Sequence, residues 1–434
     1  MPMIALPTSA LWRRCRAAGL FLGLVVLAAR LTAAPQFVSE TELVDRVIEL
    51  IDRRLALMPE VAAVKFRQQQ PIADPGREGV VLEQSVADAR AMKLEAEAAR
   101  AFFSVQIRLA RAVQEHCFER WRTRAESPPT ARDLVAVLRP ELDALGREIL
   151  PAVYLASPAL AELPAATLRP RLAPLLRQPG VTDALLAELA AALGALRITT
   201  TPTWATLQRV GVLRVGTTGD YAPFSEERGG ELQGLDIALA QALARAWDVR
   251  VVFVRTSWPT LMADLGRRRF DLAASGISVT PERQRAADFS AAYLFDGKTP
   301  IARRAEAARF SSLEKIDRPG VRVIVNPGGT NERFAREHIT RATTVLHPDN
   351  RTIFQEIVAG RADVMITDGI EVRLQTRLHP ELASTMAEPF TRAGKAILLP
   401  LGSELTARVD AWLVPQIDRG QIVERLEQAL QGAP

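Results

Sequence analysis

The stretch Ala362-Asp-Val-Met-Ile-Thr-Asp-Gly-Ile-Glu-Val372 decides the fold of the second half of the chain. Its apolar run Val364–Thr367 is typical of a buried strand, and a helical pattern follows directly. Asp368 stands where it can cap that helix, and Glu371 follows three residues later, so one interpretation is a capping box. In the alternative, Glu371 projects from the end of a sheet strand into a cleft and transfers a proton.

Around this stretch, short β-rich runs alternate with helical segments from about residue 204 to residue 434. This alternation predicts an α/β fold with mostly parallel sheets. In such folds ligands bind at the carboxyl ends of the strands. The expected strands begin near Val212 and include Arg250–Arg255, Leu272–Ala274, Val321–Val325, Val364–Thr367 and Lys395–Leu399.

Polar segments follow these strands in order, namely 217–224, 256–262, 275–278 and 326–330. Thr280 is expected to cap a helix whose first position is Pro281. Arg283 would then oppose the dipole of that helix, which suggests that it binds an anion. A surface salt bridge is the alternative. The glycines after Asn326 can expose backbone N–H groups to an anion at the start of a helix over Arg333–His338.

The first half, from about Ser39 to Leu196, is rich in helix-forming residues with apolar side chains at helical spacing. Two cations, Arg54 and Lys65, lie on this apolar stripe. Eleven residues return to nearly the same face about 16 Å along the axis, so both side chains can reach one small ligand. Pro59 can kink the helix between them. The alternatives are a snorkelling lysine and an internal ion pair.

Further polar residues lie at similar positions in the helical half. Arg77 and Glu78 open the next helix after a turn at 71–76, and Gln114 is expected to be a buried amide. Arg139 either joins the site or pairs with Asp143 one helical turn away. The segment 140–200 is expected to be packing helices broken by prolines, without visible chemistry. Residues 198–203 show neither the helical nor the strand periodicity of apolar residues and are interpreted as a linker.

The helical half resembles the secreted, gamma-type chorismate mutases. The matching pieces are Glu49–Arg54, Val61–Arg67, Pro71–Ile72 with Asp74 and Gly76–Arg77, and Phe103 with Gln106–Arg108. The resemblance implies that Arg54, Arg77 and Arg139 clamp the two carboxylates of chorismate. It implies that Lys65 and Gln114 hydrogen-bond the ether oxygen, and that Glu78 matches an acid that holds the ring hydroxyl in intracellular relatives. Two positions depart from the family pattern: Ala110 replaces a hydroxyl residue, and Val81 replaces a second amide.

The α/β half resembles periplasmic amino-acid-binding proteins and, among them, the periplasmic cyclohexadienyl dehydratases. The matches are 217–221, 256–259, 296–301, 325–332, 347–350, 365–368 and 370–371. The resemblance implies that Glu371 is the general acid. It implies that Lys298, Asn326 and Trp258 shape the environment of this acid and that further residues line the substrate pocket, namely Asp220, Ser275, Arg283 and Thr330. Asp368 stands where amino-acid binders use an acid for the ammonium group of the ligand.

Charge and targeting signals limit the remaining possibilities. The net charge of +5 comes from arginines scattered among nearly as many acids, without an aromatic-basic array for nucleic acid. Residues 1–34 have the pattern of a cleaved secretory signal, with an uncleaved anchor as the alternative and a partial twin-arginine pattern at Arg13-Arg14. Of the two cysteines, Cys15 leaves with the signal, so no internal disulfide is expected. The four histidines show no metal-ligand spacing.

The sequence therefore predicts a multidomain, periplasmic, bifunctional enzyme with a signal (1–34), an all-α chorismate mutase domain (35–200) and an α/β, two-lobed, periplasmic-binding-protein-like dehydratase domain (201–434). Chorismate would become prephenate and then phenylpyruvate, with arogenate as a parallel substrate, and without cofactor or metal. No nucleic-acid partner and no membrane anchor after signal cleavage are expected, and homo-oligomerisation stays open. The rival functions are an amino-acid-binding protein of a transporter with an accessory helical domain, and a sensor input domain.

Overall fold

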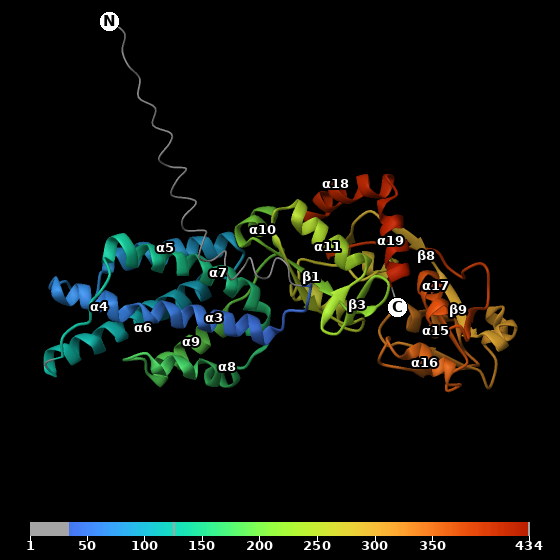
Figure 1. Ribbon diagram of the computed structural model, residues 1–434, viewed down its shortest axis with the longest axis horizontal. Coiled ribbons are helices and arrows are strands. Elements are labelled where there is room, and N and C mark those ends of the chain that lie inside the picture. Colours follow the sequence, from blue (N-terminus) through green and yellow to red (C-terminus); the bar gives the residue numbers. More distant parts are fainter. Residues whose placement is uncertain (1–33, 125, 433–434) are drawn as a thin grey trace, which may run out of the picture.

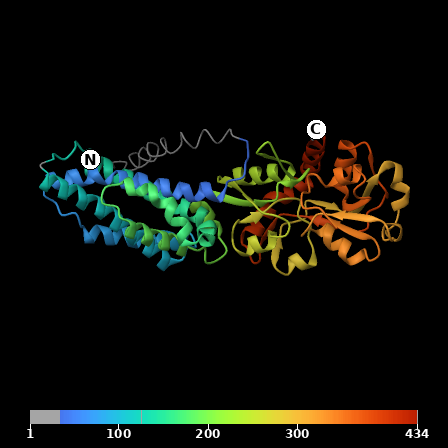
Figure 2. The same cartoon turned by 90° about the horizontal axis from the view of Figure 1, so that it is seen from below.

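The computed structural model describes residues 34–124 and 126–432. The predicted signal, including Cys15, therefore lies outside the described residues except for Ala34. A helical half at one end of an elongated molecule adjoins one α/β lobe, and a second lobe lies at the far end (Figure 1, Figure 2). Among the described residues, none of the helices has the length and apolar character needed to cross a membrane.

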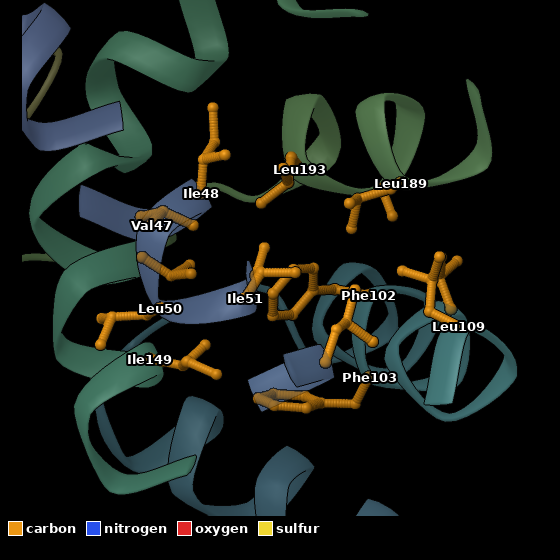
Figure 3. Close-up of a cluster of buried hydrophobic side chains, with 14 of the residues drawn as sticks. Val47, Ile48, Leu50, Ile51, Phe102, Phe103, Leu109, Ile149, Leu189 and Leu193 are labelled. Carbon is orange, nitrogen blue, oxygen red and sulfur yellow. The ribbon is translucent and has the colours of Figure 1, made fainter. Parts of the chain in front are cut away.

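The helical half is built around a long central helix, α6, as predicted for an all-α domain. Its elements are α3 (Glu40–Ala56), α4 (Met58–Arg67), α5 (Pro75–Ala91), α6 (Ala96–Thr123), η1 (Leu134–Leu138), α7 (Arg139–Glu162), α8 (Ala165–Leu172), η2 (Ala173–Arg177) and α9 (Asp183–Ala195). Figure 3 shows side chains of α3, α6, α7 and α9 meeting in one core, where Ile51 faces Phe102 and Leu50 lies near Ile149. All four of these side chains are at most 1% exposed.

The prediction that prolines break the helices of residues 140–200 does not hold for α7. Helix α7 continues through Pro151 and Pro158 instead of breaking there. The break that matters lies between α3 and α4 at Leu57, where Pro59 occupies the first turn of α4. Proline fits the start of a helix because its missing N–H has no partner there. Arg54 and Lys65 consequently belong to two helices, not to one kinked helix.

The first lobe is a mixed sheet in the order β5-β1-β6-β15-β7, with β1 parallel to both β5 and β6. One face of this sheet packs on α11 (Leu235–Ala246), α18 (Leu405–Asp418) and α19 (Gln421–Gly432). The other face packs on the short helix α12 (Leu261–Gly266). The elements are α10 (Trp204–Val210), β1 (Val212–Thr217), β2 (Asp220–Tyr221), β3 (Ser225–Arg228), β4 (Glu231–Gln233), α11 (Leu235–Ala246), β5 (Arg250–Arg255), α12 (Leu261–Gly266), β6 (Leu272–Ala273), α13 (Pro281–Gln284), β7 (Ala287–Phe289), β15 (Leu398–Pro400), α18 (Leu405–Asp418) and α19 (Gln421–Gly432).

The second lobe has the order β11-β10-β12-β9-β13, in which β10 is parallel to β11 and β12 and antiparallel strands complete the sheet. Alternate residues of β12 face opposite cores: Val364 and Ile366 face one, and Met365 faces the other. The elements are β9 (Lys298–Arg303), η3 (Arg304–Phe310), α14 (Leu313–Ile316), β10 (Arg322–Val325), α15 (Thr330–His338), β11 (Thr343–Leu346), α16 (Ile353–Val358), β12 (Val364–Asp368), α17 (Gly369–Leu378) and β13 (Leu382–Ser384).

Two antiparallel strands, β8 (Leu294–Asp296) and β14 (Ala393–Lys395), connect the lobes. The prediction of a single strand over Lys395–Leu399 is wrong, because this segment contributes to two different strands. The chain leaves β14 at Lys395 and enters β15 of the first lobe only at Leu398. The other strand predictions match the structure within one residue at each end, and the predicted helix at Arg333–His338 begins earlier, at Thr330.

The predicted linker is not a free segment. Ile198 is 8% exposed and pairs with Leu94, and the N–H of Thr199 donates to the carbonyl of Lys93. Beyond it, Val210 and Val212 belong to the core of the helical half. The two halves therefore share apolar packing on both sides of residue 200.

A buried polar junction also joins the halves. Tyr154 of α7 accepts a hydrogen bond from Arg214 of β1 at 3.1 Å and donates to Asp271 at 3.4 Å. Arg214 and Asp271 form a salt bridge at 2.7 Å with side chains 1% exposed. Buried charges of this kind need hydrogen-bonding partners, and here one of them comes from the other half of the molecule.

Candidate active sites

The cleft of the α/β half lies where strands of both lobes end, as the fold predicts. Its open volume, with solvent at the mouth included, is about 310 Å³. Its lining residues come from both lobes and from the connecting strand β14, and they are Tyr221, Trp258, Gly276, Ser278, Arg283, Asn326, Gly329, Thr330, Asn331, Asn350, Asp368 and Lys395.

Asp368, at the end of β12, is the centre of the charged groups in this cleft. The antiparallel register of β12 and β9 places Lys298 directly opposite, and its Nζ donates to Oδ1 of Asp368 at 2.8 Å. The other oxygen, Oδ2, accepts from Lys395 and from the hydroxyl of Tyr221. Burial alone would raise the pKa of Asp368, but the ammonium groups of Lys298 and Lys395 hold it well below its usual range.

Glu371 lies one helical turn beyond Asp368, in the first turn of α17, and is 2% exposed. Oε2 accepts a hydrogen bond from Thr367, and Oε1 lies 3.5 Å from Nδ2 of the cleft-lining Asn350. Burial raises its pKa to about 8, and the charge of Asp368 contributes in the same direction. Glu371 is therefore a protonated acid at neutral pH.

The capping-box interpretation of this pair is wrong. Asp368 is the N-cap residue of α17, but its side chain makes no capping hydrogen bond. The backbone N–H of Ile370 instead donates to Asp296 of β8 at 3.0 Å. An acid from the neighbouring strand therefore caps α17, and both Asp368 and Glu371 are released from that role.

Arg283 lies in the cleft, 9% exposed, and the surface-salt-bridge alternative is wrong. The predicted cap is confirmed, because Thr280 accepts from the N–H of Arg283 at 3.3 Å. The guanidinium donates to the carbonyl of Ser278 at 3.0 Å. Within residues 34–124 and 126–432, no carboxylate forms a salt bridge with it, so Arg283 has donors available for an anionic ligand.

The remaining predicted residues differ in how close they come to the cleft. Asn326, Thr330 and Trp258 line it. Asp220 lies behind Trp258 and accepts from its Nε1 at 3.1 Å. The prediction that Ser275 lines the pocket is wrong, because this side chain is fully buried among the hydroxyl groups of Thr218 and Ser225.

Sequence reasoning missed Lys395 and Tyr221 as site residues. Lys395 is 1% exposed, and its Nζ donates to Ser278 at 3.0 Å as well as to Asp368. A lysine at the end of a connecting strand has no local pattern that marks it. Tyr221 stood inside a quoted segment, but its contact with Asp368, 147 residues away, comes from the closure of the lobes.

The helical half contains a second and larger cavity, with about 2160 Å³ of empty space that opens to solvent. Every residue predicted for this half lines it, namely Arg54, Lys65, Arg77, Glu78, Gln114 and Arg139. The cavity follows one face of α5 from Asp74 to Met92. It is called the helical groove below.

The cations of the helical groove have few acidic partners. Lys65 donates to the carbonyl of Ile72 at 2.7 Å, and burial lowers its pKa. Burial likewise lowers the pKa of Arg54. The suggested pairing of Arg139 with Asp143 is not formed, because Asp143 lies 3.7 Å from Arg77 instead. The face of the groove that carries these cations suits a small anion.

Gln114 and Glu78 of the groove differ in how firmly other protein groups hold their side chains. Gln114 is 5% exposed, as predicted, and its Nε2 donates to the carbonyl of Ala110 at 3.1 Å. Glu78 is held by Arg111, whose Nε donates to Oε1 at 3.0 Å and whose Nη2 donates to Oε2. Arg111 was not predicted, and it lowers the pKa of Glu78 by hydrogen bonding. With both oxygens engaged, Glu78 is less available to a ring hydroxyl than the resemblance implied.

No group of three or more histidine, cysteine, aspartate or glutamate side chains is arranged for a metal ion in the part of the chain that the structure describes. Cys117 is a free, buried thiol.

Comparisons with known proteins cover both halves of the chain. Residues 213–428 match the model for bacterial extracellular solute-binding proteins, family 3. The cyclohexadienyl dehydratase of Pseudomonas aeruginosa is 54% identical over 224 residues, which are 51% of this chain and 83% of that protein. The chain belongs to the cyclohexadienyl dehydratase family.

Further matches cover the helical half and the α/β half. Residues 41–115 match the model for chorismate mutase type II, so a chorismate mutase region precedes the dehydratase region. The L-cystine-binding protein TcyJ of Escherichia coli is 25% identical over 51% of this chain and 84% of that protein. The crystal structure of an ancestral amino acid-binding protein, AncCDT-1, is 34% identical and covers 52% of this chain and 99% of that one, with a TM-score of 0.49.

Proposed function

We propose that the chain catalyses two consecutive steps of phenylalanine biosynthesis. The helical groove converts chorismate to prephenate, and the cleft of the dehydratase region converts prephenate to phenylpyruvate, with arogenate as a parallel substrate. The observation that carries the proposal is the buried, protonated Glu371, which feels the charges of Lys298 and Lys395, next to a cleft that Arg283 lines. A dianionic substrate that must receive a proton needs this combination.

In the cleft, the dehydration balances with one proton and no cofactor. The bond between the ring and its carboxylate breaks, carbon dioxide leaves, and the electron pair enters the ring. The C–O bond at the opposite ring position breaks, and its oxygen takes the proton of Glu371 to leave as water. Arg283 has free donors for the pyruvyl carboxylate. Glu371 can act this way at neutral pH because burial raises its pKa to about 8.

In the helical groove, a pericyclic rearrangement needs no covalent contact with the protein. The ether C–O bond breaks ahead of C–C bond formation, so negative charge grows on the ether oxygen. Lys65 and Gln114 are our candidates for stabilising that charge. Arg54, Arg77 and Arg139 are the candidates for holding the carboxylates, which would fix the reactive conformer.

A transport function is the second candidate, because the fold is that of solute-binding proteins. In that role an acid binds the ammonium group of an amino acid. Here both oxygens of Asp368 already accept from Lys298, Lys395 and Tyr221. An incoming ammonium group would have to displace two lysines, which argues against amino-acid binding. We also propose export to the periplasm, in keeping with the extracellular family and the sequence of residues 1–34.

The decisive experiment supplies chorismate to the purified protein that starts near residue 35 and follows prephenate and phenylpyruvate by chromatography. We expect both to form, with prephenate as the transient species. Amino-acid binding by calorimetry, with chorismate and prephenate left unchanged, would contradict the proposal and support the transport function.

A further inference from the structure

The further inference concerns Gln106, an amide in the middle of α6. Its side chain is 1% exposed and lines the helical groove. Among the residues that the structure describes, neither Nε2 nor Oε1 has a hydrogen-bond partner. A buried amide without partners destabilises the fold, so its presence calls for a reason beyond packing.

Gln106 belongs to a face of α6 that the groove exposes. Phe103, Gln106, Ala110 and Gln114 all line the groove at helical spacing. Gln106 and Gln114 lie eight residues, or about 12 Å, apart along the axis. Figure 3 shows Phe103 of this face lying in the same apolar cluster as Leu50 and Ile149, so the groove around it has apolar walls. In such surroundings an amide is a strong hydrogen-bonding group for a ligand.

The residue between the two amides has an apolar side chain. Ala110, one turn from Gln106 and one turn from Gln114, lines the groove but offers no side-chain hydrogen bond to a ligand. The oxygen of Gln114 is also without a partner in the described structure, so this face of α6 is prepared for ligand contact at both amides.

We propose that Nε2 of Gln106 donates a hydrogen bond to a carboxylate oxygen of bound chorismate, which makes Gln106 a substrate-binding residue. This inference rests on the proposed mutase function. The donor end is favoured because chorismate offers four carboxylate oxygens and an ether oxygen as acceptors, but one hydroxyl group as a donor. Lys65 and Gln114 are assigned to the ether oxygen, which leaves the carboxylates for Gln106.

The test replaces Gln106 by Leu, which keeps the approximate size and removes both polar atoms. We expect kcat/KM for chorismate to fall about ten- to hundredfold, the effect of one lost hydrogen bond to a charged group. The melting temperature should not fall, because the amide has no protein partner to lose. Turnover of supplied prephenate should stay unchanged and serves as an internal control. Gln106→Glu should lose more, because it removes the donor and adds a negative charge.

Val105→Ala is the matched control, because Val105 is a 3% exposed neighbour on α6 that does not line the groove. It should lower the melting temperature and leave KM for chorismate unchanged. If Gln106→Leu keeps wild-type kcat and KM, the inference is wrong and the amide is a packing residue. If the wild-type protein does not convert chorismate at all, the proposed mutase function itself is wrong, so the two failures are distinguishable.

Discussion

Glu371 is the proton donor that we propose for the dehydratase reaction. Glutamine keeps its size and can still accept from Thr367, but it has no acidic proton. We expect Glu371→Gln to bind prephenate normally and to lower kcat by about 10²-fold or more. Phenylpyruvate formation, corrected for the spontaneous reaction of prephenate in acid, measures this effect. A variant with wild-type kcat would place the proton donor elsewhere.

The pH dependence of the wild type gives a second check on Glu371. Its folded-state pKa of about 8 lies above the ordinary value of 4.5. The acid holds its proton below about pH 8, so dehydratase activity should fall as pH rises through that value. The contribution of Glu371 to the free energy of unfolding follows the same direction. It is fully present below pH 4.5 and is lost as the pH rises toward 8. Glu371→Gln should therefore gain stability relative to the wild type over this window.

Arg54 and Lys65 provide the corresponding test of the helical groove. Lys65→Ala or Arg54→Ala should lower chorismate turnover by about 10²-fold or more, because each removes a charge assigned to the substrate or to the transition state. Turnover of supplied prephenate should be unaffected. Arg53→Ala is the matched control, since Arg53 is the exposed neighbour outside the groove. Equal mutase rates in all three variants would contradict the assignment.

At the scale of elements, α17 depends on a cap that comes from another strand. Asp296 of β8 accepts from the N–H groups of Gly297 and Ile370. Asp296→Ala should destabilise the protein by about 0.5–2 kcal/mol, the usual cost of a lost cap. It should also lower dehydratase kcat, because α17 carries Glu371.

Ser312 offers a comparison on the same lobe, since it caps the short helix α14, whose residues do not line the cleft. Ser312→Ala should shift the thermal unfolding transition in the same direction with kcat unchanged. If Asp296→Ala also leaves kcat unchanged, the position of α17 does not depend on this cap.

The elements also show what the sequence could and could not reveal. The strand Val364–Asp368 and the cap at Thr280 depend on neighbouring residues, and both were predictable. The six predicted side chains of the helical groove could be found because helical spacing and a family resemblance can both be read from the linear sequence. Asp296 as a cap, Lys395 beside Asp368 and Arg111 on Glu78 depend on which strands and helices become neighbours. No local pattern encodes that, so these contacts needed the structure.

At the scale of the molecule, the halves are joined by more than a linker. Val210 and Val212 complete the helical core, and Tyr154 completes the polar junction with Arg214. A fragment of residues 35–200 should therefore keep mutase activity but lose it at a lower temperature than the intact protein does. Residual activity after heating measures this difference. Equal inactivation temperatures would show that the boundary near residue 200 separates independent domains, as the sequence alone predicts.

The first described residues have a consequence for the order of folding. Phe37 pairs with Phe253 of β5, and the carbonyl of Pro35 accepts from Leu232. Strand β15 and helices α18 and α19 return from the end of the chain to the same lobe. The first lobe therefore combines segments that precede the helical half with segments that follow the second lobe, and contacts this distant in sequence form slowly. During synthesis the helices can assemble early, but the first lobe stays incomplete until the second lobe and the final helices have emerged.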